Sequence, residues 1–363
     1  MRASLFPLLA IVVAAHAQDD GFVPLFNGRD LSGWVNVNCA AETWGVKDGM
    51  ITCTGRPTGA MRTARQYENF IFECEWRHLV QGGNAGIFIW ASAISWPGVP
   101  FLRAIEVQVL EDAYGNTENY TTHGDVFPIH GSTMKPFGRS RGMRSFPSEH
   151  RSKPSPEWNH YRIEAKDGVL RLSVNGKEVS GGEECVWRKG FLALESEGGQ
   201  TEWRNLRIKE LPASGAKPEE SAPEAQGHRA LYSGLDLRGW KTESPERWQP
   251  SDWRLVLKEG ATSASLVTEA EFGDCEIILD AKLTAKSTDR AWSKLSFRGH
   301  DVELPLTDKW QRFTFQVKNG RLTSVVEGPE AAVSVDLPKA KSAIGLSGSG
   351  AAVEFAGIYV REL

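Results

Sequence analysis

The side chains best suited to chemistry lie in one short stretch, residues 105–111. Apolar β-branched residues alternate there with Glu106 and Gln108, which is the period of two of a half-buried β-strand. Glu111 joins the same face if a β-bulge follows Val109. Two carboxylates on one strand suit acid–base or nucleophilic work, and a retaining hydrolysis would need them about 5–5.5 Å apart. The alternative is an exposed strand face whose acids are simply solvated.

More polar side chains follow in the longest unpatterned segment of the chain, residues 111–158. This segment contains His123, Asp125 and His130, and histidine both titrates near neutrality and ligates metals. A divalent cation is therefore a candidate cofactor; alternatively, the histidines bond the backbone of their own loop. Upstream, the almost wholly apolar residues 84–90 predict a neighbouring strand. A carboxylate strand between an apolar strand and a polar loop predicts a cleft on the floor of a β-sandwich.

Short alternating runs closed by turn-forming pairs make up most of the chain, and helical periodicity is nearly absent after the N-terminus. Residues 70–77 and 161–165 alternate cleanly, and Asp167-Gly168 joins the second run to residues 170–174. Runs of this length and spacing predict an all-β sandwich or barrel.

Residues 1–17 are predicted to be a signal peptide. Arg2 supplies the positive charge, residues 5–15 the apolar run, and Ala15-His16-Ala17 a small-x-small cleavage site. We therefore expect cleavage near Ala17 and export to the periplasm or the extracellular space. No segment has the length needed to span a membrane. The net charge of −4, from 42 basic and 46 acidic residues, argues against nucleic acid or an anionic membrane as a partner.

The cysteines leave the disulfide question open. An exported chain with five of them permits disulfides but leaves one thiol unpaired, and the sequence does not choose among the pairings. Cys74 alternates with Phe72 and Trp76, so it is predicted to be a buried core thiol. No pair has the spacing of zinc ligands. The five are Cys39, Cys53, Cys74, Cys185 and Cys275.

The last third of the chain repeats the first part. Residues 25–34 match residues 231–240 at an offset of 206, and residues 158–211 match residues 310–363 without a gap at an offset of 152. Matches of this length predict a duplicated domain.

The duplication divides the chain. We expect a first domain at residues 22–211 and a degenerate, accessory β-sandwich at residues 228–363. The segment between them, 212–227, contains three prolines and no large apolar side chain, so it is predicted to be a disordered linker. The second copy lacks about 54 residues from its middle, given by the drop between the two offsets. We assign the loss to the strands at 84–90 and 105–111 and to the histidine-containing loop.

Comparison of the copies separates scaffold from candidate chemistry. Glu195 of the first copy becomes Ser347 in the second, and Arg204 becomes Ala356. Glu195 faces away from the apolar residues of its strand, so it is a candidate partner for Glu106. Arg204 falls where the apolar phase slips by one in both copies, which predicts a β-bulge. Since a bulge does not require arginine, Arg204 is a candidate for binding sugar hydroxyls or holding a carboxylate, and a structural salt bridge is the alternative.

The first copy resembles the 3-keto-disaccharide hydrolase family, whose modules have a concanavalin-like jelly-roll fold. The resemblance covers residues 22–211, and position 90, often arginine in the family, is Trp90 here. Its motifs are Leu25-Phe26-Asn27-Gly28-x-Asp30-Leu31-Ser32-Gly33-Trp34, Asn84-x-Gly86-Ile87-Phe88, Glu106-x-Gln108-x-Leu110-Glu111, Trp158-Asn159-x-Tyr161, Asn175-Gly176 and Arg204-Asn205-Leu206.

The resemblance implies cleavage of a small carbohydrate, a glycoside oxidised to a ketone at C3. The ketone acidifies the C2 hydrogen, so a base can form an enediolate that expels the C1 substituent, and water can then add. The candidate catalytic residues are Glu106, Glu111, His123 and Glu195. The candidate substrate-binding residues are Asn84, Trp90, Gln108, Asp125, His130 and Arg204.

Two other functions fit the same sequence. The first domain could be a non-catalytic, lectin-like carbohydrate-binding module, because concanavalin-like sandwiches often only bind sugar. It could also be an ordinary glycoside hydrolase that needs no keto group. Replacing Glu106 separates an enzyme from a lectin, and an unoxidised substrate separates the two enzymes.

Overall fold

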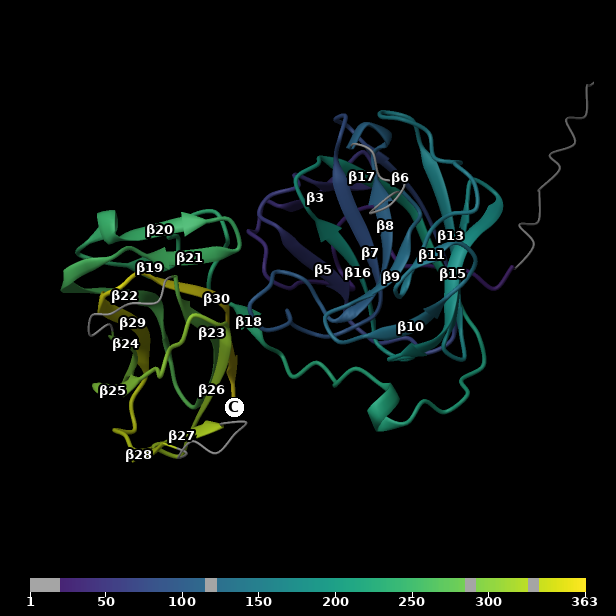
Figure 1. The fold of residues 1–363 in the computed structure, drawn as a ribbon. Coiled ribbons are helices and arrows are strands. Elements are labelled where there is room, and N and C mark those ends of the chain that lie inside the picture. Colours follow the sequence, from purple (N-terminus) through teal and green to yellow (C-terminus); the bar gives the residue numbers. More distant parts are fainter. Residues whose placement is uncertain (1–19, 115–122, 285–291, 326–332) are drawn as a thin grey trace, which may run out of the picture.

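The computed structural model describes residues 20–114, 123–284, 292–325 and 333–363 (Figure 1). The predicted signal peptide, residues 1–17, lies outside them. Within the described residues the chain forms strands and three short 3-10 turns, η1 (Asp112–Tyr114), η2 (Pro218–Glu220) and η3 (Pro245–Arg247). None of its described helices is both long and apolar enough to cross a membrane. The prediction of an all-β jelly-roll sandwich followed by a smaller β-sandwich is confirmed.

Two antiparallel sheets, I and II, form the first sandwich. Sheet I has the order β10 (Thr133–Pro136), β15 (Lys177–Val186), β14 (Val169–Val174), β13 (Asn159–Lys166), β6 (Phe70–His78), β17 (Thr201–Glu210), β4 (Met50–Cys53) and β3 (Trp44–Lys47), with β1 (Val23–Pro24) paired to β17. Sheet II has the order β11 (Ser140–Arg141), β12 (Arg144–Ser145), β9 (Val126–Ile129), β8 (Ala104–Leu110), β7 (Asn84–Ala91), β16 (Phe191–Ser196), β5 (Gly59–Thr63) and β2 (Trp34–Asn36).

Two further antiparallel sheets, III and IV, form the second sandwich. Sheet III has the order β20 (Trp248–Ser251), β21 (Arg254–Leu257), β30 (Val353–Glu362), β23 (Cys275–Leu283), β26 (Gln311–Lys318), β27 (Arg321–Val325) and β28 (Ser334–Asp336), with β18 (Arg229–Ala230) paired to β30. Sheet IV has the order β19 (Trp240–Lys241), β22 (Gly260–Phe272), β29 (Ser342–Gly350), β24 (Trp292–Phe297) and β25 (His300–Glu303).

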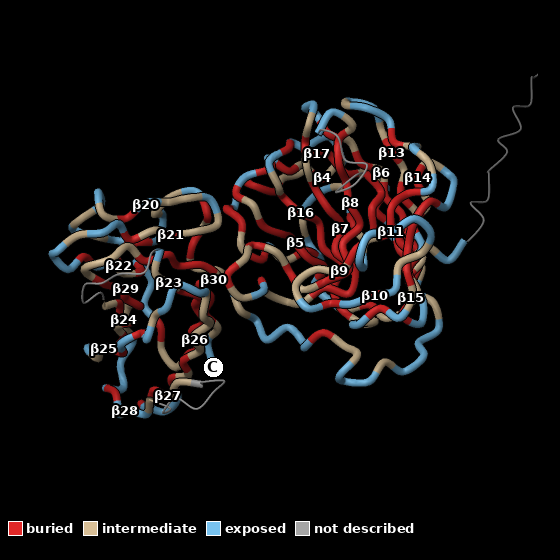
Figure 2. The backbone as a smooth tube through the Cα atoms, viewed as in Figure 1, coloured by how far each residue is buried: buried red, intermediate tan, exposed pale blue. Residues whose placement is uncertain are grey.

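The predicted hairpin and core lie where the sequence pattern places them. Lys166 pairs with Val169 across a two-residue turn whose members, Asp167 and Gly168, both have positive φ. Positive φ at both central residues is the requirement of a type I′ turn, which favours Asp-Gly. Figure 2 shows the buried interior that sheets I and II enclose. Cys74 is fully buried there, as predicted, and all five cysteines are buried free thiols, so no disulfide links them.

The second sandwich has the same strand neighbours as the first, which supports the proposed duplication. The indole N–H of Trp34 donates to the Leu25 carbonyl at 2.8 Å, and that of Trp240 donates to the Leu231 carbonyl at 2.8 Å. The predicted bulge is present in both copies. In the first it lies between Arg204 and Arg207 on β17, and in the second it lies on β30, opposite residues 278–280 of β23.

The assignment of the missing middle is wrong in part. In the second copy β24 pairs with β29, and β25 pairs with β24, just as β7 pairs with β16 and β8 with β7 in the first. Both strands are therefore kept in shortened form. Between β25 and β26 the described residues contain no counterpart of β9 to β12. The two offsets gave the number of residues missing from the second copy but not their position. The shortened strands are too different in sequence to align.

The segment 212–227 is ordered against the first sandwich rather than disordered. The Gln66 side-chain amide donates to the Ala222 carbonyl at 2.8 Å, and the Ala222 N–H donates to the Lys189 carbonyl at 2.8 Å. Arg188 forms an ion pair with Glu220 at 3.0 Å. The composition suggested disorder because it offers little apolar surface, but hydrogen bonds to the backbone can order such a segment instead.

The second sandwich packs on sheet II. Ile278 and Tyr359 join an apolar cluster with residues of sheet II that include Phe88 and Ala193. The segment 92–103 between β7 and β8 lies at this contact (Figure 1). There the Tyr359 hydroxyl donates to Ser95 Oγ at 3.0 Å, and the Gly98 N–H donates to the buried Asp280 carboxylate at 3.0 Å. The second sandwich therefore fixes the connection between the two strands that carry Asn84, Glu106 and Gln108.

Candidate active site

The face of sheet II that points away from the core carries the predicted acids. Strand β8 places its β-branched residues in the core, so the intervening Glu106 and Gln108 lie on the opposite face. Only 7% of Glu106 and 3% of Gln108 is exposed. The alternative of a solvated strand face is therefore wrong, because loops and neighbouring strands cover this surface as well.

Gly86 on β7 allows Glu106 and Glu195 to approach each other closely. A Cβ atom at this position would lie 2.8 Å from Glu195 Oε2 and 3.0 Å from Glu106 Oε1. The glycine therefore lets both carboxylates lie directly against the backbone of β7, Glu106 from β8 and Glu195 from β16. Among the described residues, Glu195 Oε2 is buried without a hydrogen-bond partner. A buried acceptor of this kind is expensive to keep, which makes it a candidate for contact with a ligand.

Two amides extend the cluster to a third acid. Gln108 Nε2 donates to Asn84 Oδ1 at 2.7 Å, and Asn84 Nδ2 donates to Glu197 Oε2 at 2.5 Å. The structure thus brings four of the predicted residues together: Glu106, Gln108, Asn84 and Glu195. We name Glu106, Glu195 and Glu197 the carboxylate cluster.

Asp125 and Arg144 supply charge on the β9 side of the cluster. Arg144 Nη1 donates to Asp125 Oδ2 at 2.9 Å, and its guanidinium lies 3.3 Å from the centre of the Phe127 ring. Phe127 is the β9 partner of Glu106. Asp125, predicted as a substrate-binding residue, therefore lies at the edge of the cluster. Its arginine gives the site a positive charge that could face a developing oxyanion.

Burial keeps protons on the carboxylate cluster. Burial, followed by the charge of Glu197, raises the pKa of Glu106 to about 8, although Arg144 acts in the opposite direction. Burial also raises the pKa of Glu197 to about 7, with a further contribution from Asp252 of the second sandwich. Burial and the two neighbouring acids raise the pKa of Glu195 well above its ordinary value. At neutral pH the cluster can therefore both donate and accept protons.

Glu111 does not reach this site. Its carboxylate accepts backbone N–H bonds from Gly82, Ala113 and Ser155 at 2.6–2.9 Å. Burial alone would raise the pKa of Glu111, but these three donors outweigh it and lower the pKa. The chain thus uses Glu111 to join three loop segments, and an ionised, fully bonded carboxylate is a poor proton carrier. Its predicted catalytic role is not supported.

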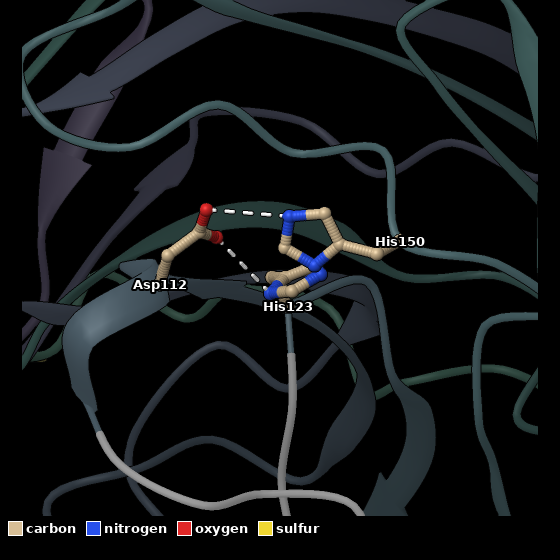
Figure 3. Close-up of side chains that lie close together, drawn as sticks. All are labelled: Asp112, His123 and His150. Atoms are coloured by element: carbon tan, nitrogen blue, oxygen red, sulfur yellow. Dashed lines mark ion pairs between the residues drawn. The ribbon is translucent and has the colours of Figure 1, made fainter.

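His123 lies in a separate group with Asp112 and His150 (Figure 3). Burial, followed by the neighbouring His150, lowers the pKa of His123 to about 4, so its ring is neutral at pH 7. It is not poised to exchange protons near neutrality, contrary to the predicted role. The three side chains together are the described residues best arranged to hold a metal ion.

Three predicted substrate-binding residues make contacts other than with the cluster. Trp90 has a φ of 53°, which turns its ring into the core, where its indole N–H donates to the Glu68 carbonyl at 2.8 Å. His130 stacks on Phe101 beside the segment 92–103. Arg204 lies on sheet I, the opposite sheet, where it pairs with Glu75 at 2.5 Å. Its structural salt bridge was the alternative given by the sequence.

Sheet I carries a groove of its own. It has a volume of about 560 Å³ and is lined by side chains that include Phe22, Glu73, Glu75, His160 and Arg207. Its charged groups already pair with one another, since Arg207 donates to Glu73 at 2.6 Å. The groove can offer hydrogen bonds to a sugar. Burial alone would raise the pKa of its Glu73, but Arg162 and Arg207 outweigh burial and lower it, unlike in the carboxylate cluster.

Sequence analysis missed three members of the site: Gly86, Arg144 and Glu197. The comparison of copies contained a signal for one of them, because Glu197 becomes Ser349 in the second copy. Gly86 stands in a motif but offers no functional group. Arg144 is one of several basic residues in a long loop, and only the fold shows which of them approaches Glu106.

Comparison with known proteins gives one family match. The model of a 3-keto-alpha-glucoside-1,2-lyase-like domain matches residues 21–209. No curated protein sequence matches the chain. A candidate glycosyl hydrolase from Parabacteroides distasonis is 22% identical, with a TM-score of 0.41, and the match covers 53% of this chain and 94% of that one. A carbohydrate-binding module from Bacillus subtilis is 13% identical, with a TM-score of 0.34, and the match covers 49% of this chain and 95% of that one.

Proposed function

Because the chain belongs to the 3-keto-alpha-glucoside-1,2-lyase-like family, we propose that its first sandwich cleaves 3-keto-glycosides by elimination between C2 and C1. The observation that carries this proposal is the carboxylate cluster packed against Gly86. It provides proton donors and an acceptor within one buried space, as this chemistry requires. We further propose residues 22–211 as the catalytic domain and residues 228–363 as an accessory domain. The predicted signal peptide supports export.

The proposed reaction begins with proton transfer from C2. The pKa of Glu197 is raised to about 7, below the value of about 8 for Glu106, so we assign Glu197 as the base that takes this proton. The electrons of the C2–H bond form an enediolate with the C3 oxygen. As the C3 carbonyl re-forms, the C1–O bond breaks and leaves a double bond between C1 and C2. Addition of water across that double bond completes a net hydrolysis.

The other two acids of the cluster act on the departing C1 oxygen and on the enediolate oxygen. Glu106 is protonated at neutral pH, so we assign it as the acid that gives a proton to the departing C1 oxygen. Burial and the neighbouring acids raise the pKa of Glu195 well above its ordinary value, so we assign Glu195 as the acid that donates a hydrogen bond to the enediolate oxygen, as a buried protonated acid does in ketosteroid isomerase. Arg144 adds positive charge on the same side, and Asn84 and Gln108 orient Glu197.

The experiment that tests the proposal compares a 3-keto-disaccharide with its unoxidised parent. We expect the purified protein to release the aglycone sugar from the keto substrate only, because the parent lacks the acidic C2 hydrogen. Release from both would favour an ordinary glycoside hydrolase. Release from neither would contradict enzymatic activity on these substrates. Parallel reactions with a chelator determine whether turnover needs a metal ion.

The pKa values of the cluster predict a bell-shaped dependence of kcat/KM on pH. Activity should fall below about pH 7, where Glu197 takes up a proton and ceases to be a base. It should also fall above about pH 8, where Glu106 loses the proton needed by the leaving group. Because the acids interact, the two limbs describe the cluster as a whole. Initial rates measured between about pH 5 and 9 check this, and a flat profile would contradict the assignment.

A non-catalytic carbohydrate-binding protein is the second candidate, and the groove on sheet I is the observation that favours it. A lectin would bind its sugar at the groove without turnover. Titration of the protein with oligosaccharides tests this. Loss of binding on replacement of Arg207, rather than of Glu106, would place the ligand on sheet I.

A further inference from the structure

Three potential ligand atoms converge at the end of β8, outside the carboxylate cluster. His123 Nδ1 lies 3.4 Å from Asp112 Oδ1, and His150 Nε2 lies 3.3 Å from Asp112 Oδ2. The ligand atoms of all three residues lie within 4.8 Å of one another. Figure 3 shows the two rings turned toward the carboxylate. Ion-paired hydrogen bonds are usually 2.7–2.9 Å long, so these separations are wide for direct bonds.

The three side chains come from separate parts of the long connection between β8 and β13. Asp112 belongs to η1, directly after β8, whereas His123 precedes β9 and His150 follows β12. A hydrogen bond also holds the carboxylate in place, since Ser152 Oγ donates to Asp112 Oδ1, the oxygen nearest His123, at 2.5 Å. A hydrogen bond of this kind is what orients a carboxylate ligand in metal sites.

We propose that Asp112, His123 and His150 form a binding site for a divalent transition-metal ion such as Zn²⁺. Two imidazoles and one carboxylate are a ligand set typical of zinc and of non-haem iron, and they leave positions open for water or another ligand. Calcium and magnesium prefer sites made of oxygen atoms, so they should bind more weakly.

A bound ion would connect three loop segments beside the carboxylate cluster. His123 is followed by Gly124, whose N–H donates to the Gln108 carbonyl at 3.1 Å, and then by Asp125. Fixing His123 therefore fixes the backbone that carries Asp125 along β8. This inference concerns metal binding and does not depend on the proposed activity.

Metal titration of the full-length protein, freed of metal and of any histidine tag, tests the proposal. Calorimetry with Zn²⁺ should give one ion per chain, and Co²⁺ should give the visible absorption of a nitrogen- and oxygen-ligated ion. Zn²⁺ should also raise the Tm by roughly 5–10 °C, since an ion that binds only the folded state stabilises it. His150→Ala, at an exposed position, should weaken Zn²⁺ binding at least ~10²-fold and abolish the shift in Tm.

His160→Ala provides the matched control. His160 is partly exposed and lies 3.8 Å from a carboxylate, that of Glu73, but it belongs to no group of potential metal ligands found among the described residues. Zn²⁺ binding should be unchanged in this variant. Binding that survives both His150→Ala and Asp112→Asn would overturn the proposal, as would the absence of stoichiometric binding. Tighter binding of Ca²⁺ than of Zn²⁺ would overturn the assigned class of ion.

Discussion

Replacing Glu106 by glutamine is expected to reduce turnover of a 3-keto-disaccharide by ~10²–10⁴-fold, the range for loss of a general acid. Glutamine keeps the shape and hydrogen-bonding capacity of the buried side chain, so substrate binding should change only several-fold. Steady-state kinetics together with a direct binding titration separate the two effects. A similar loss in binding and turnover would show that Glu106 mainly positions the substrate.

The stability of the Glu106→Gln variant supplies an internal check. The pKa of Glu106 is raised to about 8 in the folded protein, so the folded state holds a proton that the unfolded chain releases near its ordinary pKa. Protonation therefore favours folding at low pH, and this acid costs stability increasingly as pH rises toward 8. The variant should match the wild type near pH 5 and exceed it by up to a few kcal/mol above pH 8. Glu178→Gln, at an exposed position on sheet I, should alter neither activity nor this pH dependence.

Local patterns predicted the strands and the bulges because both depend on neighbouring residues. The alternation of apolar and polar residues predicted the face on which Glu106 and Gln108 lie. The one-residue shift in that alternation after Trp203 predicted the bulge on β17. The role of Glu111 depends instead on N–H groups at residues 82 and 155, which are remote in sequence. Trp90 points into the core and not toward the predicted substrate site, because its positive φ shifts the alternation of side chains along β7. Such effects depend on contacts and backbone angles of the folded chain, so the local sequence pattern does not predict them.

Position 86 distinguishes the first copy, which carries the carboxylate cluster, from the second copy, which keeps only the fold. In the second copy Lys294 pairs with Ser347, the counterpart of Glu195, and so takes the place of Gly86. Lys294 forms an ion pair with Asp301 at 3.6 Å. The first copy is thus distinguished by an added carboxylate and by removal of the side chain that would fill the space between the acids.

Gly86→Ala should therefore impair catalysis without removing any catalytic group. The new methyl group would lie 2.8 Å from Glu195 Oε2 and 3.0 Å from Glu106 Oε1, so both carboxylates must move. A displacement of about 1 Å in a catalytic constellation can cost ~10²-fold in rate, and we expect a loss of that size in kcat. Gly45→Ala is the matched control, because its Cβ would lie 3.0 Å from Thr52 Oγ1 on sheet I. Neither glycine has a positive φ, so both variants should fold. Equal activity of the two variants would show that the position of Glu106 and Glu195 against Gly86 does not matter for the reaction.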